Sequence, residues 1–193
     1  MEEKTEELLR SKLEDGETVL WTGKAVPGKI LSPAYRQDFL LKLVISGGIG
    51  LFFVIQCIKS AVEAGEPLKI GPVLVIIGVA AVAPCAVLAD GKRAGRLRYA
   101  ATDRRLITLN LDNFNCVFYK TIHDAAFRKD SDGKTSLLCG KSAVLSSPSK
   151  WRDIATRNCP FLSEKGVCEA FALYAVDDAE GLKKAVGNKL SAA

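Results

Sequence analysis

The chain has 193 residues, of which 48% are hydrophobic and 25% are charged, and its formal net charge is +5 at pH 7. These proportions exclude a disordered chain, a collagen-like chain and a disulfide-rich miniprotein. The modest basic excess suits a surface facing anionic lipid better than a nucleic-acid-binding protein, so we expect no nucleic-acid partner. The charged residues are unevenly distributed. Residues 39–89 contain only five of them, namely Lys42, Lys59, Glu63, Glu66 and Lys69.

Residues 1–38 predict a short helix followed by a strand. The first 14 residues have an amphipathic helical pattern that ends at Asp15-Gly16. Val19 and Trp21 then alternate with polar neighbours, as they would in a half-buried strand. We assign this segment to the beginning of a cytosolic domain.

Residues 39–89 predict a transmembrane helical hairpin. The two apolar runs, 39–58 and 70–89, have twenty residues each, and a helix of that length spans the roughly 30 Å hydrocarbon core of a bilayer. The intervening polar segment contains Gly65 and Pro67, which favour a turn. The alternative is a pair of buried core helices in a soluble protein, which a chain of this length could hardly enclose.

Small residues in both runs predict close packing of the two helices, because they let membrane helices approach each other. The residues expected to face one another are Gly47, Gly48 and Gly50 on the first helix, and Gly71, Gly78, Ala80, Ala81 and Ala83 on the second.

The distribution of Lys and Arg predicts the orientation of the hairpin. Lys29 and Arg36 precede it and four basic residues follow it, whereas the short loop carries only Lys59 and Lys69. The positive-inside rule therefore places both termini in the cytoplasm. We expect a two-pass integral protein of the inner or plasma membrane.

Residues 90–193 predict the main part of a cytosolic domain, built from short antiparallel strands and a C-terminal helix. Asp132-Gly133 is a strong hairpin signal. Residues 147–168 are predicted to be irregular, and Asp177 or Asp178 is expected to cap a helix over 178–190. The expected strands are 98–101, 106–110, 116–122, 125–129, 135–139, 142–146 and 169–176.

Two motifs resemble those of bacterial pleckstrin-homology-like (bPH) domain membrane proteins. The first, LEDGETVLWTGK at residues 13–24, resembles their opening motif, and the second, YAATDRRLI at residues 99–107, resembles their characteristic hairpin. A two-helix membrane insert between such motifs is also common in that family. The motif residues to which we assign a structural role are Gly16, Glu17, Trp21, Gly23, Tyr99 and Thr102.

The resemblance implies an α+β membrane protein in which the hairpin is inserted into a PH-like domain. That domain would be a strongly bent, seven-stranded antiparallel sheet or barrel capped by the C-terminal helix. The opening motif would complete the sheet that the chain builds after the hairpin. Because fold does not determine function, we transfer no lipid-binding site from the family.

Residues suited to catalysis or cofactor binding are scarce in the sequence. His123 is the only histidine and has no recognisable partner, and nucleophile-elbow, HExxH and phosphate-loop motifs are missing. The six cysteines, at positions 57, 85, 116, 139, 159 and 168, lack the spacing of metal ligands. We therefore expect no enzymatic activity, no cofactor and no metal.

Two groups of basic residues are candidate binding sites. Lys92, Arg93, Arg96 and Arg98 follow the second membrane helix, where they set the topology, contact anionic lipid headgroups, or do both. Arg104 and Arg105 belong to the second motif. They either stabilise that turn or bind an anion or an acidic partner.

Three functions are compatible with these features. The leading hypothesis is a non-enzymatic, membrane-anchored interaction module that binds an unidentified protein partner at the cytosolic face of the membrane. The alternative is a sensor of anionic lipid or phosphate that acts through the basic cluster. A small transport accessory is the third, although the apolar helices lack the ionisable residues that mark ion paths. The oligomeric state stays open.

Overall fold

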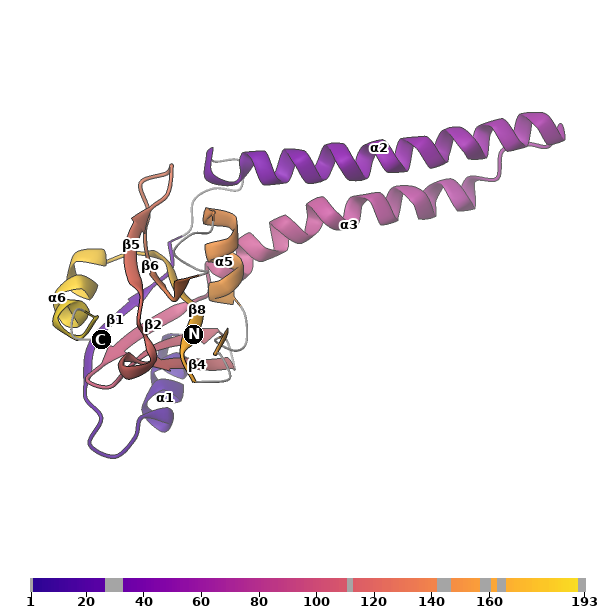
Figure 1. Cartoon of the computed structure of the whole chain (residues 1–193). Coiled ribbons are helices and arrows are strands. Elements are labelled where there is room, and N and C mark those ends of the chain that lie inside the picture. Colours follow the sequence, from indigo (N-terminus) through magenta and orange to yellow (C-terminus); the bar gives the residue numbers. More distant parts are fainter. Residues whose placement is uncertain are drawn as a thin grey trace.

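The computed structural model describes residues 2–26, 33–110, 113–141, 147–156, 161–162 and 166–190. These residues have an α+β architecture, in which two antiparallel sheets with three shorter helices form one unit, and two long helices project from it side by side (Figure 1). The predicted strand at 142–146 and Lys29 lie outside the described residues.

The first sheet joins the segment before the long helices to the segment after them. Its strands run in the order β1 (Val19–Lys24), β2 (Arg98–Thr102), β3 (Arg105–Asn110) and β4 (Asn113–Phe118). β1 pairs antiparallel with β2, and Gly23 lies opposite Tyr99. β4 starts earlier than the predicted strand 116–122. It also ends earlier, because Tyr119–Thr121 form a 3-10 turn, η1.

The second sheet contains the predicted Asp-Gly hairpin. Its strands run in the order β5 (Ala125–Lys129), β6 (Thr135–Cys139), β8 (Cys168–Val176) and β7 (Phe161–Leu162). The hairpin between β5 and β6 has the predicted boundaries. Gly133 in its turn has φ +76°, a conformation in which a side chain would be strained.

The two sheets meet at one corner and are not closed into a barrel, so the barrel form of our expectation is wrong. At that corner Ala25 pairs with Val176, and the Val26 N–H donates to the Ala175 carbonyl at 2.7 Å. The pairing stops there because the chain turns at Asp177 into the final helix.

The C-terminal helix, α6 (Ala179–Leu190), begins as predicted and packs next to β1 and β2. Asp178 is its N-cap, because the side-chain Oδ1 accepts a hydrogen bond from the Gly181 N–H at 2.9 Å. Leu182 and Val186 are fully buried in the main hydrophobic core. This core also receives side chains from both sheets.

The N-terminal helix, α1 (Glu2–Lys12), packs on a second, smaller core formed by the first sheet. Leu9 is buried there against Ala100, Ile107 and Leu109. Successive side chains of a strand point to opposite faces. The first sheet therefore contributes to two cores, with Ala100 facing α1 and Ala101 in the main core.

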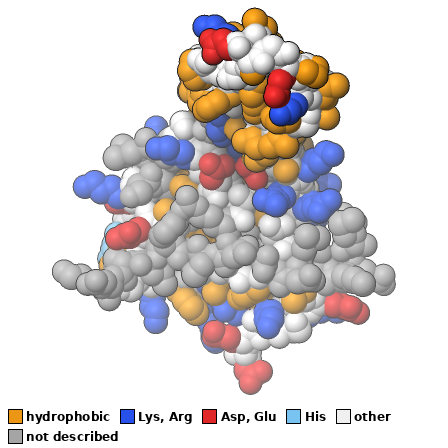
Figure 2. All heavy atoms as spheres, turned by 90° about the vertical axis from the view of Figure 1, so that its right-hand side faces the viewer, with side chains coloured by type: hydrophobic (Ala, Val, Ile, Leu, Met, Phe, Trp, Pro, Cys, Tyr) orange, Lys and Arg blue, Asp and Glu red, His pale blue; other side chains and the backbone are white. Residues whose placement is uncertain are grey.

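The two long helices, α2 (Pro33–Ala64) and α3 (Ile70–Ala94), extend beyond the predicted runs 39–58 and 70–89. Residues such as Glu63, Ala64 and Lys92 continue them because these are good helix formers. Apart from Leu20 and Val26, every exposed large hydrophobic side chain described lies on these helices or in the turn between them. Figure 2 shows the apolar surface of the hairpin from its far end. The expectation of two long apolar helices is confirmed.

Packing between α2 and α3 involves fewer of the small residues than expected. A Cβ atom added to Gly50 would lie 2.9 Å from the Ala80 Cβ, so the helices approach closely at this point. Gly47, Gly48 and Gly78 have no such neighbour within 4 Å, and neither does Gly71. Their predicted contacts across the hairpin are wrong, because only one strip of each helix faces the other.

A helix that the sequence did not predict, α5 (Pro148–Thr156), lies across the base of the long helices (Figure 1). It packs against β8, α2 and α3 and buries Trp151, Arg152 and Ala155. The irregular structure expected over 147–168 is therefore wrong for this part. Pro148 stands at the first helical position, where proline is favoured, rather than marking a loop.

Candidate functional site

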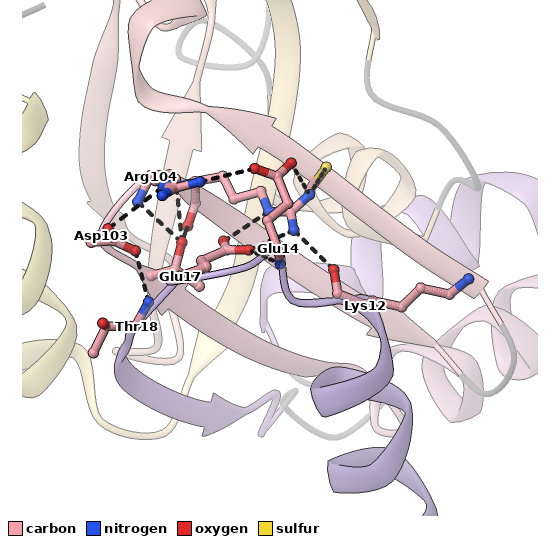
Figure 3. A network of polar contacts seen from close by, with 9 residues as sticks. Lys12, Glu14, Glu17, Thr18, Asp103 and Arg104 are labelled. Atoms are coloured by element: carbon pink, nitrogen blue, oxygen red, sulfur yellow. Dashed lines mark hydrogen bonds and ion pairs between the residues drawn. The ribbon is translucent and has the colours of Figure 1, made fainter.

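The two sequence motifs meet in a network of polar contacts around Arg105 (Figure 3). The Arg105 guanidinium donates from Nε to Glu17 Oε1 at 2.8 Å and from Nη2 to Glu17 Oε2 at 2.6 Å. The Glu17 side chain is fully buried and the Arg105 side chain is 6% exposed. This bidentate pair links residues that lie 88 positions apart in the sequence.

Arg105 also fastens α1 to the first sheet. Its Nη2 donates to the Lys12 carbonyl at 2.9 Å, which satisfies one of the acceptors left open at the end of a helix. The guanidinium lies 5.5 Å from the ring centroids of both Phe114 and Phe118. Because the guanidinium N–H groups of Arg105 donate to Glu17 and to the Lys12 carbonyl, its contacts are those of a structural residue rather than of an anion-binding one.

The pair is ionised at neutral pH. Burial by itself would raise the pKa of Glu17, but hydrogen bonds from Arg105 and from the Glu14 N–H outweigh it and bring the pKa down to about 2. The hydrogen bond to Glu17 raises the pKa of Arg105 above its ordinary value. Folding therefore favours the charged form of both groups.

The turn between β2 and β3 holds the neighbouring Arg104 at the surface. Thr102 Oγ1 accepts hydrogen bonds from the N–H groups of Arg104 and Arg105, at 3.2 and 3.0 Å. Asp103 Oδ1 accepts from the Thr18 N–H at 2.9 Å. The Arg104 side chain is 44% exposed and its Nη1 lies 3.2 Å from Glu14 Oε2. Of the two motif arginines, Arg104 is the accessible one.

The remaining motif residues contact the core and the corner between the sheets. The indole N–H of Trp21 donates to Asp178 Oδ2 at 3.1 Å, and its ring lies over Gly23, where an added Cβ atom would be 2.3 Å from ring carbons. The Tyr99 hydroxyl donates to the Tyr174 carbonyl at 2.8 Å and accepts from the Tyr174 N–H at 3.0 Å. Gly16, at φ +74°, forms the turn that leads to Glu17.

The predicted basic cluster is divided between two surfaces. Lys92 and Arg93 lie in the last turn of α3, Arg96 lies in the turn that follows, and all three are exposed. Arg98 is the first residue of β2 and is partly buried, and its Nη1 donates to the Leu97 carbonyl at 3.2 Å. The sequence neighbours are separated because the chain passes from a helix into a sheet at Leu97.

Arg98 lines a groove of about 470 Å³ between α1 and the first sheet, beside its outer strand β1. Leu9, Leu13, Val19 and Leu109 provide its apolar surface. Its charged lining residues are three basic and two acidic, namely Arg10, Lys24, Arg98, Glu6 and Asp177. We name this hollow the α1 groove.

Sequence reasoning missed the α1 groove because its lining residues come from four separate elements and from two residues outside them, Leu13 and Asp177. The only local signal was the charged face of the first helix, with Glu6 and Arg10 one turn apart. An apolar surface with a mixed charged rim can accommodate both apolar and charged groups of a ligand.

Two of the candidate metal-ligating cysteines, Cys139 and Cys168, lie close together on the neighbouring strands β6 and β8. His123 is exposed before β5. Among the described residues, no group of three or more His, Cys, Asp or Glu side chains is placed to hold a metal ion. Burial raises the pKa of the Cys168 thiol to about 11, which keeps it protonated at neutral pH. Cys159 lies outside the described residues.

Comparison with known proteins gave no relative for this chain. No protein-family model, no curated protein and no solved structure matches it. The bPH resemblance therefore rests on the two motifs and on the order of the elements around them, and it stays a prediction.

Proposed function

We propose that α2 and α3 anchor the chain in a membrane as a two-pass hairpin. Residues 39–64 and 70–94 are long and apolar enough to cross a bilayer, and only 6% and 11% of their most apolar stretches are buried. Residues 70–89 carry no charge, and at 1.5 Å per residue they extend about 30 Å. Exposed apolar surface of this extent favours insertion in lipid over contact with water.

We further propose that both termini lie in the cytoplasm, because the basic excess follows the hairpin. A cysteine at Lys69 in the turn between the helices, introduced into a variant without native cysteines, would then react with a membrane-impermeant maleimide in intact cells. A cysteine at Lys183 in α6 would react only after permeabilisation. The reverse labelling pattern would refute the orientation, and extraction of the protein by alkaline carbonate would refute the anchor.

We propose a PH-like fold for the α+β unit. The features that support it are the four-stranded antiparallel meander, the second antiparallel sheet and the C-terminal helix packed next to the first sheet. The motif residues hold these parts together, since Trp21 binds the N-cap of α6 and Tyr99 bonds to β8. The hairpin then enters the domain as an insertion between β1 and β2.

We propose that this unit is a non-enzymatic interaction module that binds a protein partner in the α1 groove. The observation that carries the proposal is the groove itself, which combines an apolar surface with three basic residues, Arg10, Lys24 and Arg98, against the two acidic residues Glu6 and Asp177. The partner segment that fits it has apolar side chains for that surface and acidic side chains for the three basic groups. Anchoring by the hairpin would keep this binding surface at the membrane.

The test is affinity purification of the tagged full chain from its own membranes in mild detergent, followed by mass spectrometry. Arg10→Glu and Arg98→Glu reverse charges in the groove. Lys12→Glu makes the same change in the same last turn of α1 and serves as the matched control, because Lys12 does not line the groove.

A partner that is lost with both groove variants and retained with Lys12→Glu would support the proposal. A partner that binds all the variants equally would refute the groove as its site. If the wild-type chain retains no specific protein, the interaction-module hypothesis is wrong.

A further inference from the structure

The base of the hairpin carries exposed basic side chains from three segments, which we name the basic collar. We infer that the collar, Arg36, Lys92, Arg93, Arg96 and Lys150, binds the phosphate groups of anionic membrane lipids. This inference rests on the proposed anchoring of α2 and α3 in a membrane. It goes beyond that proposal because it assigns a lipid class and a set of residues.

The collar is assembled by tertiary structure. Arg36 is in the first turn of α2, whereas Lys92 and Arg93 end α3 and Arg96 follows them. Lys150 is exposed on α5, which packs against both long helices. In the view along the hairpin, Lys and Arg side chains lie on both sides below its apolar surface (Figure 2). The sequence had identified only the part that follows α3.

The collar lies at the depth of the lipid phosphates if the uncharged part of α3 fills the hydrocarbon. That part ends at Ala89. At 1.5 Å per residue, Lys92 and Arg93 follow about 5 and 6 Å further along the helix axis. The attraction of basic residues to anionic headgroups acts within a Debye length of the membrane surface, about 8 Å at physiological ionic strength, and these positions next to the hydrocarbon edge lie within that range.

The charge balance favours anion binding at this end of the hairpin. In the first two turns of α2, the last two turns of α3, the turn after it and α5, the acidic residues are Asp38, Asp90 and Asp153, which are fewer than the five basic residues of the collar. Asp153 contacts Arg152 at 3.4 Å, and Asp90 contacts Arg93 at 3.5 Å while the Arg93 side chain stays 66% exposed. A surface ion pair of this kind is weak enough for a phosphate to compete with it.

The opposite end of the hairpin has no such excess. Lys59 and Lys69 are balanced there by Glu63 and Glu66, and Lys69 is paired with Glu66 at 3.1 Å. The collar therefore makes the two ends electrostatically different, and anionic headgroups are attracted to the collar end. Arg can also bind a phosphodiester through two parallel hydrogen bonds, which Lys cannot do.

The experiment measures binding of fluorescent phosphatidylglycerol, and of phosphatidylcholine as the zwitterionic comparison, to the full chain in uncharged detergent micelles. The test variant is Lys92→Gln/Arg93→Gln/Arg96→Gln. The matched control is Arg98→Gln, because Arg98 is close in sequence but lines the α1 groove. Unfolding monitored by tryptophan fluorescence shows whether each variant is folded.

Each basic side chain near a membrane surface contributes about fivefold in affinity for anionic lipid. We expect the triple variant to bind phosphatidylglycerol on the order of 100-fold more weakly and the Arg98 variant to bind it within about twofold of wild type. Phosphatidylcholine binding should not change. The preference of the wild type should also fall as the salt concentration rises.

The inference is overturned if the folded triple variant keeps the wild-type preference for phosphatidylglycerol over phosphatidylcholine. It is also overturned if Arg98→Gln loses as much affinity for phosphatidylglycerol as the triple variant does. These outcomes are separate from failure of the proposed function. A chain that alkaline carbonate extracts from membranes would refute both, whereas a stably inserted chain without lipid preference would refute the collar alone.

Discussion

Removing the charge of Glu17 should destabilise the α+β unit strongly. In Glu17→Gln the Arg105 guanidinium stays buried but loses its carboxylate and one of two charge-assisted hydrogen bonds, at 2.6 and 2.8 Å. Breaking a buried pair by removing one partner costs about 3–5 kcal/mol, because the remaining charge is left uncompensated. Since glutamine retains one acceptor, we expect a loss of about 3 kcal/mol in the free energy of unfolding.

The assay is chemical unfolding of the full chain in mild detergent, followed by tryptophan fluorescence. Trp21 and Trp151, the two tryptophans, both lie in the α+β unit, so the signal reports on this unit rather than on the hairpin. Arg104→Met is the control, because its 44% exposed side chain makes only surface contacts. It should cost less than about 1 kcal/mol.

A double-mutant cycle separates the pair from its surroundings. If Glu17 and Arg105 stabilise the fold through each other, Glu17→Gln combined with Arg105→Met should cost clearly less than the sum of the single changes. Additive losses, or a loss below about 1 kcal/mol for Glu17→Gln, would refute the assignment of this pair as the main connection between the motifs.

Three further measurements address the same structure. The pKa of Glu17 is about 2 in the folded chain and ordinarily 4.5, so its contribution to stability is complete above about pH 4.5 and is lost as the pH falls toward 2. The free energies of unfolding of the wild type and Glu17→Gln, measured at several pH values, should therefore converge in acid. A difference that stays constant with pH would contradict this. Gly23→Ala places a Cβ atom 2.3 Å from the Trp21 ring and should lower the free energy of unfolding by about 1–3 kcal/mol. Gly187→Ala on α6 places its Cβ atom in open space and should raise the free energy of unfolding by up to about 1 kcal/mol. Unfolding midpoints measure both changes. Gly50→Leu should separate α2 from α3 and so weaken disulfide cross-linking between cysteines placed on the facing strips of the two helices. Gly47→Leu should leave this cross-linking unchanged. Equal effects of the two substitutions would disprove the helix contact.

The amino-acid sequence determined the elements whose signals are local. Two uncharged or nearly uncharged runs were sufficient to predict α2 and α3, and Asp132-Gly133 predicted the β5–β6 hairpin, whose ends are as expected. The pair Asp177-Asp178 predicted the start of α6, and the structure shows that Asp178 is the cap. In each case, the pattern that predicts the element lies in residues close together in the sequence, because helix periodicity, helix caps and tight turns depend on near neighbours.

Tertiary structure decided what the charged residues do. Nothing near Arg105 in the sequence shows that it is buried, because its partner Glu17 lies 88 positions away on the other side of the hairpin. Lys92 and Arg98 look alike in the sequence, yet one lies in the basic collar and the other in the α1 groove. Pro148 is typical of irregular structure by its local pattern, yet it begins α5, in which Trp151 is buried against the rest of the protein. These roles follow from burial and from long-range pairing, which local residue patterns do not encode.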